Sequence, residues 1–396
     1  MSPSRAVCLV LLLASCSSEV PPPTGKVLDL GSRSAAFAFR FHGEMLRRNE
    51  GRNVFVSPAS VLFALSMATS GARGETAEEM LSALELKGWK REDLDAACAG
   101  LLPWLEGGEP AVQLNVANSA WMRQKYPFEP SYVKTLETDY HAQARAVDFD
   151  DPKTLDVINR WVQDRTQGRI AKAGPDRIEP LDALFLINAV YFKGGWTRKF
   201  EKALTHDQPF KLGNGKTKTL PFMRRKARYS YAETTDYQAI QIPYGEKGRT
   251  AFYVVLPREG MSLRQLHDQL AAKGSKWNVD LIMHEVDLEL PRFKLEFGAE
   301  LRPVLSEMGM KKAFGRADFT GMSPRGRELY VSAVHHKTYV DINEEGTEAA
   351  AVTTVGVGAK SAEFEKFVLK VDRPFFCAIV DHTTGTILFT GSIVEP

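Results

Sequence analysis

The stretch EEGTEAAAVTTVGVGAKSAEF, residues 344–364, is the feature that most constrains how this chain can fold. Between residues 349 and 359 it has no charge and no side chain larger than Val or Thr. Read with a period of two, residues 347–359 present one small, uncharged face and a second face whose only charge is Glu348. Pro is absent and Gly occurs only late, so the segment is able to form a strand in the middle of a sheet.

The residues in front of this stretch, 330–343, already alternate like one long strand. A continuous strand across both segments would have about 30 residues, where roughly 3–10 is normal, so a turn is needed near residues 344–346. Two arrangements then remain open. The small residues either turn back beside their parent strand, or stand off as an exposed loop tipped by Lys360 and Ser361, where proteases cut.

The predicted elements place helices mostly early in the chain and strands mostly late. Ser57 is a good N-cap for a buried helix that has Pro58 at its first position. Other helical patterns cover residues 34–47, 75–84, 91–105, 130–139 and 154–166. Strand patterns include residues 112–122, 184–192, 250–256, 330–343 and 375–380. No linker or repeat divides residues 30–396, which predicts a single domain of the α+β class.

The N-terminus, residues 1–15, is typical of a secretory signal peptide. Arg5 precedes an apolar run far shorter than the roughly 20 residues needed to span a bilayer. Leu-Ala-Ser-Cys at residues 13–16 resembles a bacterial lipidation signal, in which Cys16 becomes the lipidated first residue; the alternative is a plain signal with an incidental Cys16. Residues 16–29, rich in Pro, are then a tether. We expect an exported protein held at the outer membrane or cell surface, or otherwise periplasmic or extracellular.

Neither composition nor motifs indicate an enzyme, a nucleic-acid partner, a metal site or a cofactor. The formal net charge is +2, and the densest basic run, residues 224–228, is typical of a solvated loop or strand face. Residues 356–361 lack the Gly directly before Lys that a phosphate loop needs. Beyond the N-terminal segment only Cys98 and Cys377 remain, without metal-ligand spacing, and a single bridge between them stays open.

Several motifs, in order along the chain, resemble those of the serpin family. They are NVFVSPAS at 53–60, NAVYFKGGW at 188–196, VHH at 334–336, EEGTEAAA at 344–351, DRPFF at 372–376 and FTG at 389–391. The resemblance covers residues 30–396 and implies three β-sheets, about nine helices and an exposed reactive-centre loop at about 344–366. It also implies a metastable state, in which a protease cuts the loop, forms an acyl-enzyme and is trapped as the cleaved loop inserts into the central sheet.

The resemblance also implies roles for single residues. Counted from Glu344, the bond cut in the family falls at Lys360–Ser361, and cleavage at Ala359 or near Glu363 is the alternative register. Lys360 suits a trypsin-like pocket, whose buried Asp favours a cation. The loop hinge would comprise Glu344, Gly346, Thr347, Glu348, Ala349, Ala350 and Ala351.

Two further groups match family positions around the central sheet. The first is a polar cluster under the sheet, where strands part to admit the loop: Ser57, Ser60, Asn188 and His336. Polar side chains there can exchange hydrogen bonds as the sheet opens. The second group lies where the hinge enters the sheet and consists of Trp196 and Arg292, and Arg292 is expected to pair with Glu344.

These residues favour a monomeric, irreversible inhibitor of trypsin-like serine proteases that forms a covalent complex with its target. A bulky, charged or Pro residue between residues 347 and 354 would block insertion, and apart from Glu348 on the outer face none is present. Two alternatives stay open. One is a cross-class inhibitor of papain-like cysteine proteases, and the other is a non-inhibitory serpin acting as a binding module. Membrane contact is expected only through the lipid anchor.

Overall fold

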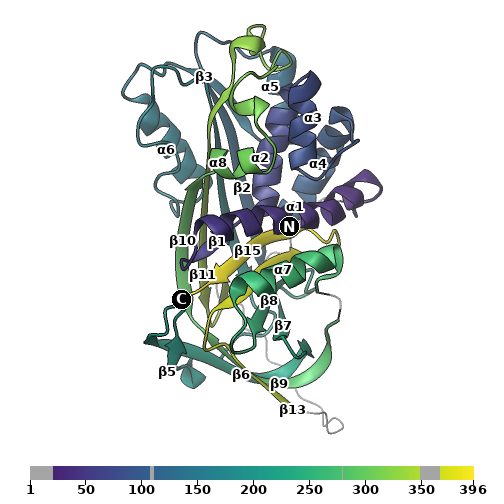
Figure 1. Ribbon diagram of the computed structural model, residues 1–396, viewed down its shortest axis with the longest axis vertical. Helices are drawn as coiled ribbons and strands as arrows, with labels where there is room; N and C mark the ends of the chain where they lie inside the picture. Colours follow the sequence, from purple (N-terminus) through teal and green to yellow (C-terminus); the bar gives the residue numbers. More distant parts are fainter. Residues whose placement is uncertain (1–20, 108–110, 279, 348–365) are drawn as a thin grey trace, which may run out of the picture.

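The computed structural model describes residues 21–107, 111–278, 280–347 and 366–396 (Figure 1). These residues contain eight α-helices and four short 3-10 helices. The α-helices are α1 Lys26–Arg48, α2 Pro58–Gly71, α3 Gly74–Ala83, α4 Arg91–Glu106, α5 Pro130–Asp139, α6 Thr154–Arg165, α7 Leu263–Lys273 and α8 Arg302–Glu307. The 3-10 helices are η1 Lys202–Leu204, η2 Gly274–Lys276, η3 Lys312–Phe314 and η4 Gly326–Glu328.

The same residues contain fifteen strands, and most of them follow the helices α1 to α6. The first seven are β1 Val54–Val56, β2 Val112–Arg123, β3 Gln143–Val147, β4 Leu184–Gly195, β5 His206–Lys211, β6 Thr217–Glu233 and β7 Tyr237–Pro243. The others are β8 Thr250–Pro257, β9 Ile282–Pro291, β10 Phe293–Glu300, β11 Val331–Asn343, β12 Gly346–Thr347, β13 Lys366–Lys370, β14 Phe375–Asp381 and β15 Ile387–Ile393. The predicted α+β class is therefore confirmed.

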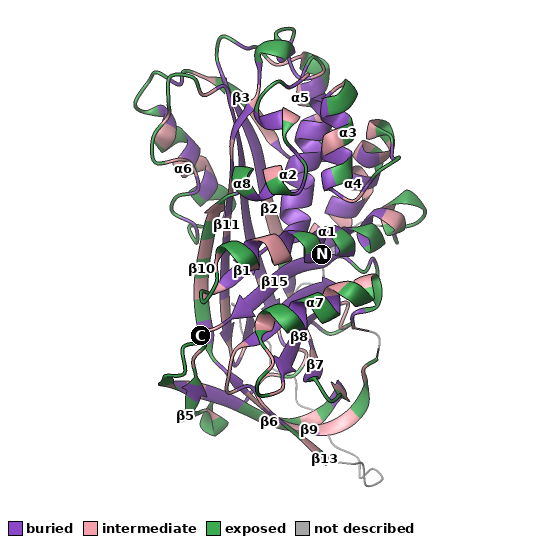
Figure 2. Ribbon diagram, in the orientation of Figure 1, coloured by how far each residue is buried: buried purple, intermediate pink, exposed green. Residues whose placement is uncertain are grey.

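A six-stranded sheet in the order β10-β11-β12-β4-β2-β3 forms the centre of the molecule. Its strand β4 is apolar on both faces because both faces are covered. Leu186 and Val190 face the main core, which includes α2, whereas Ile187 and Tyr191 pack with α6. Figure 1 places α6 on one side of this sheet and α2 to α5 on the other, and Figure 2 shows α2 as buried along its whole length.

The second sheet has nine strands, in the order β1-β15-β14-β8-β7-β6-β9-β13, with β5 paired to β6. Its β6 strand is long enough to pair with three strands: residues 217–222 pair with β5, residues 222–231 with β9 and residues 230–233 with β7. Hydrogen bonds therefore join the described strands into two sheets, where three were expected. The basic run at residues 224–228 is a strand face of β6, and Arg224 pairs with Asp287 across to β9.

The first helix begins earlier than the sequence predicted. Residues 26–29 were assigned to the tether, but α1 starts at Lys26. This turn is held because Lys26 lies 4.5 Å over the Trp89 ring and Leu30 is fully buried in the core. The first turn of α1 is therefore anchored by a cation–π contact and a buried leucine, although the residues before it have a tether-like composition. Within the described ranges, no helix is long and apolar enough to cross a membrane.

Candidate functional site

Among the described residues, the hinge segment contributes Gly346 and Thr347 to the six-stranded sheet. Strand β12, Gly346–Thr347, lies between β11 and β4 and pairs antiparallel with both, Thr347 opposite Ile342 on one side and Gly194 on the other. Beyond it, β11 and β4 pair directly with each other in parallel, from Tyr339 and Tyr191 down to the ends of their ladder. The two strands are thus parted at one end and closed along the rest of their length.

Gly346 is the residue that lets the chain turn into this gap. Its φ is +147°, a conformation that side chains disfavour, and a Cβ there would lie 2.0 Å from the Gly194 carbonyl oxygen. Gly194 is equally constrained, because a Cβ on it would press against the rings of Tyr244 and Phe192. Gly346 stands opposite Gly195, and Thr347 opposite Gly194, so glycines without side chains allow three backbones to meet at this point.

Thr347 anchors the inserted end through a buried hydroxyl. It is fully buried, and its Oγ1 lies 2.5 Å from the hydroxyl of Tyr244. The Tyr244 ring in turn stacks on Trp196 at 4.5 Å between centroids. Trp196 also holds the hinge backbone, because its indole N–H donates to the Asn343 carbonyl and its amide donates to the Glu345 carbonyl. Trp196 was predicted at this place from its motif.

The two glutamates before β12 are held by ion pairs. Glu344 is buried; its carboxylate accepts a 2.8 Å hydrogen bond from Thr205 and lies 3.5 Å from Arg292, the partner expected from the sequence. Of this pair, the Arg292 side chain is exposed and the Glu344 side chain is buried. Glu345 lies 2.7 Å from Lys199, and this contact lowers the pKa of the Glu345 carboxyl below its usual range.

The polar cluster predicted under the sheet is assembled in one row across three strands. His336 on β11 stands opposite Asn188 on β4, and Asn188 stands opposite Asn118 on β2. His336 Nδ1 lies 2.5 Å from Asn188 Oδ1, and the Asn188 amide donates to Asn118 Oδ1 at 2.5 Å. Asn188 also donates to the backbone carbonyl of Ser60 at 3.1 Å and to the Ser60 hydroxyl. All four residues are buried.

The start of helix α2 contacts this row of polar side chains through Ser57. The Ser57 backbone N–H donates to His336 Nε2 at 3.1 Å, so that nitrogen is an acceptor and the imidazole is neutral with its proton on Nδ1. Burial lowers the pKa of His336 to about 3, which keeps it neutral at physiological pH. Ser57 caps the helix as predicted and its hydroxyl donates to the Leu388 carbonyl.

Two residues of the site were not predicted from the sequence. Asn118 lies within the strand predicted at 112–122. An amide side chain inside a buried strand, as at Asn188, is the sequence signal that could have identified it. Its own amide nitrogen has no partner among the described residues. Tyr244 stands just after β7 and carries no local pattern that marks it.

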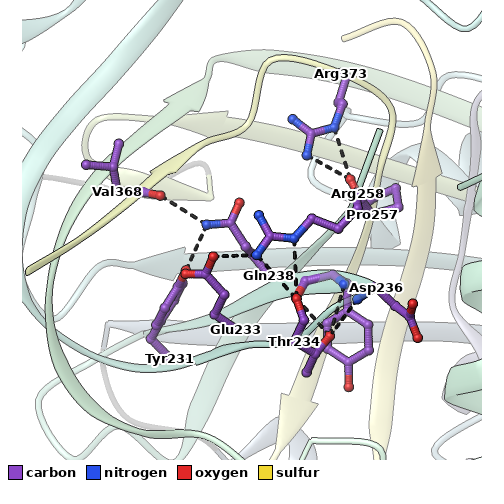
Figure 3. A network of polar contacts seen from close by, with 10 residues as sticks. Tyr231, Glu233, Thr234, Asp236, Gln238, Pro257, Arg258, Val368 and Arg373 are labelled. Atoms are coloured by element: carbon purple, nitrogen blue, oxygen red, sulfur yellow. Dashed lines mark hydrogen bonds and ion pairs between the residues drawn. The ribbon is translucent and has the colours of Figure 1, made fainter. Parts of the chain in front are cut away.

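The described chain resumes after residue 347 with strand β13, which begins at residue 366. Figure 3 shows the polar network around this strand. The Gln238 amide donates to the Val368 carbonyl at 3.0 Å and to the Tyr231 hydroxyl at 2.8 Å. Arg373, from the DRPFF motif, donates twice to the Pro257 carbonyl, at 2.8 and 3.0 Å. The chain is thus paired into a sheet both at residue 347, in β12, and at residue 366, in β13.

Several predicted residues lie outside the described residues: Cys16, Glu348, Ala349, Ala350, Ala351, Lys360 and Ser361. Cys98 and Cys377 are described, and both are free and buried, so no bridge joins them. Burial raises the pKa of each thiol, which makes both unreactive. Among the described residues no cluster of three or more His, Cys, Asp or Glu side chains is arranged to hold a metal ion.

Comparison with known proteins agrees with this architecture. The sequence model described as "Serpin (serine protease inhibitor)" matches residues 32–396. An uncharacterized serpin-like protein of Thermococcus kodakarensis is 38% identical, covering 91% of this chain and 84% of its own. Intracellular coagulation inhibitor 2 of Tachypleus tridentatus is 34% identical, covering 88% and 86%.

A solved structure has the same fold. The thermophilic serpin tengpin in its native state is 30% identical, with a TM-score of 0.85 over 95% of this chain and 96% of that one. Serpins are in general protease inhibitors rather than enzymes. From the family match over residues 32–396 and these relatives, the chain is a member of the serpin family.

Proposed function

We propose that this protein is an irreversible suicide-substrate inhibitor of trypsin-like serine proteases. The observation that carries the proposal is β12, which has already entered the sheet between β11 and β4 while the rest of that pair is closed. Residues 349–359 are small and without Pro, and Glu348 lies on the other face of the pattern, so this segment would be able to continue the same strand without steric conflict. Lys360 supplies the cation that a trypsin-like pocket binds.

Insertion changes hydrogen bonds mainly between β11 and β4. A new strand would separate His336 from Asn188, but Asn188 and Asn118 stay opposite each other because β4 and β2 remain paired. The amide hydrogens of Asn118 and the second lone pair of the Asn188 side-chain oxygen are then available to form new hydrogen bonds in place of the one that is lost. Because its members can exchange hydrogen bonds as the sheet opens, we expect a polar row of this kind to part at less cost than an apolar core would repack.

The test is to incubate the intact protein with trypsin and separate the products on a denaturing gel. We expect a complex that survives denaturation, together with a small peptide that begins at Ser361. A Lys360→Ala variant is the matched control and should form far less complex with trypsin. Cleavage at Lys360 without any stable complex would show that the protein is only a substrate.

We also propose that the mature protein is exported and tethered through a lipid on Cys16. The support is the signal-like N-terminus and the residues Leu-Ala-Ser-Cys at 13–16. Metabolic labelling with a fatty acid should mark the wild-type protein and not a Cys16→Ala variant. Equal labelling of both would rule out this anchor.

A further inference from the structure

Two buried histidines meet where α1 packs against α7, over strands β14 and β15 (Figure 1). His42 is on α1 and His267 is on α7, and the two residues are 0% and 6% exposed. Their imidazole rings stack with 5.6 Å between the ring centres and 28° between the planes. The helices approach so closely here that a Cβ added to Gly43 would lie 2.7 Å from the His267 ring. The histidine pair therefore lies at the contact between the two helices.

The His267 imidazole faces a hydrogen-bond acceptor at each of its two nitrogens. Its Nε2 lies 2.9 Å from the Phe39 carbonyl oxygen, and its Nδ1 lies 3.2 Å from a carboxylate oxygen of Asp268. A backbone carbonyl and an ionised carboxylate can only accept, so each contact needs a proton on the ring nitrogen. Both hydrogen bonds are therefore complete only when His267 is an imidazolium ion.

The surroundings of His42, in contrast, suit only a neutral ring. Its Nε2 lies 2.8 Å from the Ser392 hydroxyl, and its buried Nδ1 has no hydrogen-bond partner among the described residues. Strand β14 covers the ring with Phe376, at 5.5 Å between ring centres. Burial, and after it the charge of His267, lowers the pKa of His42 well below its usual value.

The elements around His42 offer no carboxylate to balance a second proton on its ring. Strands β14 and β15 present the Phe376 ring and the Ser392 hydroxyl, and Lys276, the charged residue of η2, is exposed. Asp268 on α7 has a side chain that is 69% exposed, and it contacts His267. Among the described residues, His267 is the charged group that shifts the pKa of His42, and it shifts it downward.

We propose that His42 and His267 form an acid-sensitive clasp between α1 and α7, which opens when both rings are protonated. Two stacked imidazolium ions repel each other, and a charged His42 is solvated only if the helices separate. Separation would uncover an aromatic cluster in which the Phe39 ring lies 5.8 Å from Trp277 and 6.3 Å from Phe376. A fall in pH would thus expose an apolar surface. This device does not depend on protease inhibition.

The experiment is hydrogen exchange of the intact protein, measured by mass spectrometry on peptides from α1 and α7 between about pH 7.5 and about pH 5. The rates are corrected for the pH dependence of intrinsic exchange. Because opening is coupled to protonation of His42, the open fraction of these helices should rise by up to about tenfold per pH unit below about pH 6.5. His42→Gln, which keeps a polar partner for Ser392, should remove this rise in both helices.

The matched control is His141→Gln, which alters an exposed histidine that pairs with Glu106, and it should keep the wild-type rise. The slopes with pH are compared, so a lower stability of His42→Gln does not affect the result. Ring nitrogen NMR of the unsubstituted protein gives an independent readout, in which His267 should become doubly protonated at a higher pH than His42. The proposal is overturned if His42→Gln keeps the wild-type slope, or if His42 is the first of the two rings to become doubly protonated.

Discussion

Gly346 and Thr347 set the geometry of the hinge through opposite properties. Gly346 works because it has no side chain where its backbone meets Gly194. Thr347 works because its small side chain is buried and its hydroxyl meets that of Tyr244. Motif resemblance was enough to single out both residues. It did not reveal Tyr244, because the contact joins segments that are far apart in sequence and depends on the exact sheet register.

Replacing Gly346 by Ala should destabilise the intact protein by about 2–4 kcal/mol, from backbone strain together with the clash at Gly194. Gly51→Ala is the matched control, since Gly51 has φ +71° but open space around its Cβ position, and it should cost about 1 kcal/mol. Denaturant unfolding of both variants measures the difference. Equal losses would mean that contact with Gly194 is unimportant.

His336 makes the stability of the protein depend on pH. Its pKa is about 3 in the folded chain, against an unperturbed value of 6.5, because burial disfavours the charged imidazolium. As the pH falls, His336 therefore binds a proton near pH 6.5 in the unfolded chain but only near pH 3 in the folded chain. The stability from His336 is complete above pH 6.5 and is lost as the pH falls toward 3, by up to about 1.4 kcal/mol per pH unit.

A His336→Gln variant should lose less stability than wild type on moving from pH 6.5 to pH 4.5, although it starts less stable at neutral pH. Some pH dependence should persist, because burial also lowers the pKa of His335, to about 4. The measurement is the free energy of unfolding by denaturant at several pH values. Parallel pH profiles for the two proteins would exclude His336 as the titrating group.

At the scale of secondary-structure elements, the long apolar segments were predictable, whereas several strands in which polar residues interrupt the apolar pattern were not. The strands predicted at 330–343 and 184–192 correspond closely to β11 and β4, because β4 is buried along almost its whole length and β11 alternates between buried and half-buried residues along much of its length. The strands β5, β6 and β7 and the helix α7 were missed. In β6 exposed basic residues such as Arg224 and Lys226 interrupt the apolar pattern, and they are held there by carboxylates of β9, which lie far away in sequence.

On the proposed function, β12 is the element that decides whether the protein acts as an inhibitor or as a substrate. Arginine at position 347 has no room, because Thr347 is fully buried between β11 and β4. A Thr347→Arg variant should be cleaved by trypsin without forming a stable complex, which a denaturing gel distinguishes directly. The control is Leu181→Arg, which places the same side chain at a position that is 81% exposed. It should inhibit like wild type, and retained inhibition by Thr347→Arg would refute insertion through this gap.

At the scale of the whole molecule, the fold keeps a buried parallel pair, β11 and β4, where a further antiparallel strand would fit between them. Antiparallel pairing is slightly more stable per residue than parallel pairing, and insertion replaces one ladder by two. The sequence predicted the single domain and its class, because the order of helices and strands is local information. It did not predict that β6 would join strands into one nine-stranded sheet, since this depends on strand pairing.

Cleavage of the loop should therefore raise the temperature of unfolding well above that of the intact protein. The comparison is a thermal melt before and after limited digestion with a protease that cuts in the region 344–366 without being trapped. Thr347→Arg provides the control, because cleavage cannot be followed by insertion and its melting temperature should stay the same. Identical midpoints for intact and cleaved wild type would contradict a metastable native state.

The two-residue strand β12 also has a kinetic consequence. The slow step in adding a strand to a closed sheet is forming the first residue pairs, because the entropy of bringing the segments together is lost before any stabilising contact forms. Here those pairs exist before a protease arrives, with Thr347 already opposite Ile342 and Gly194. On the proposed mechanism, β12 is a preformed nucleus, and after cleavage only the propagation of the strand, in a fixed register and direction, would have to compete with hydrolysis of the acyl-enzyme.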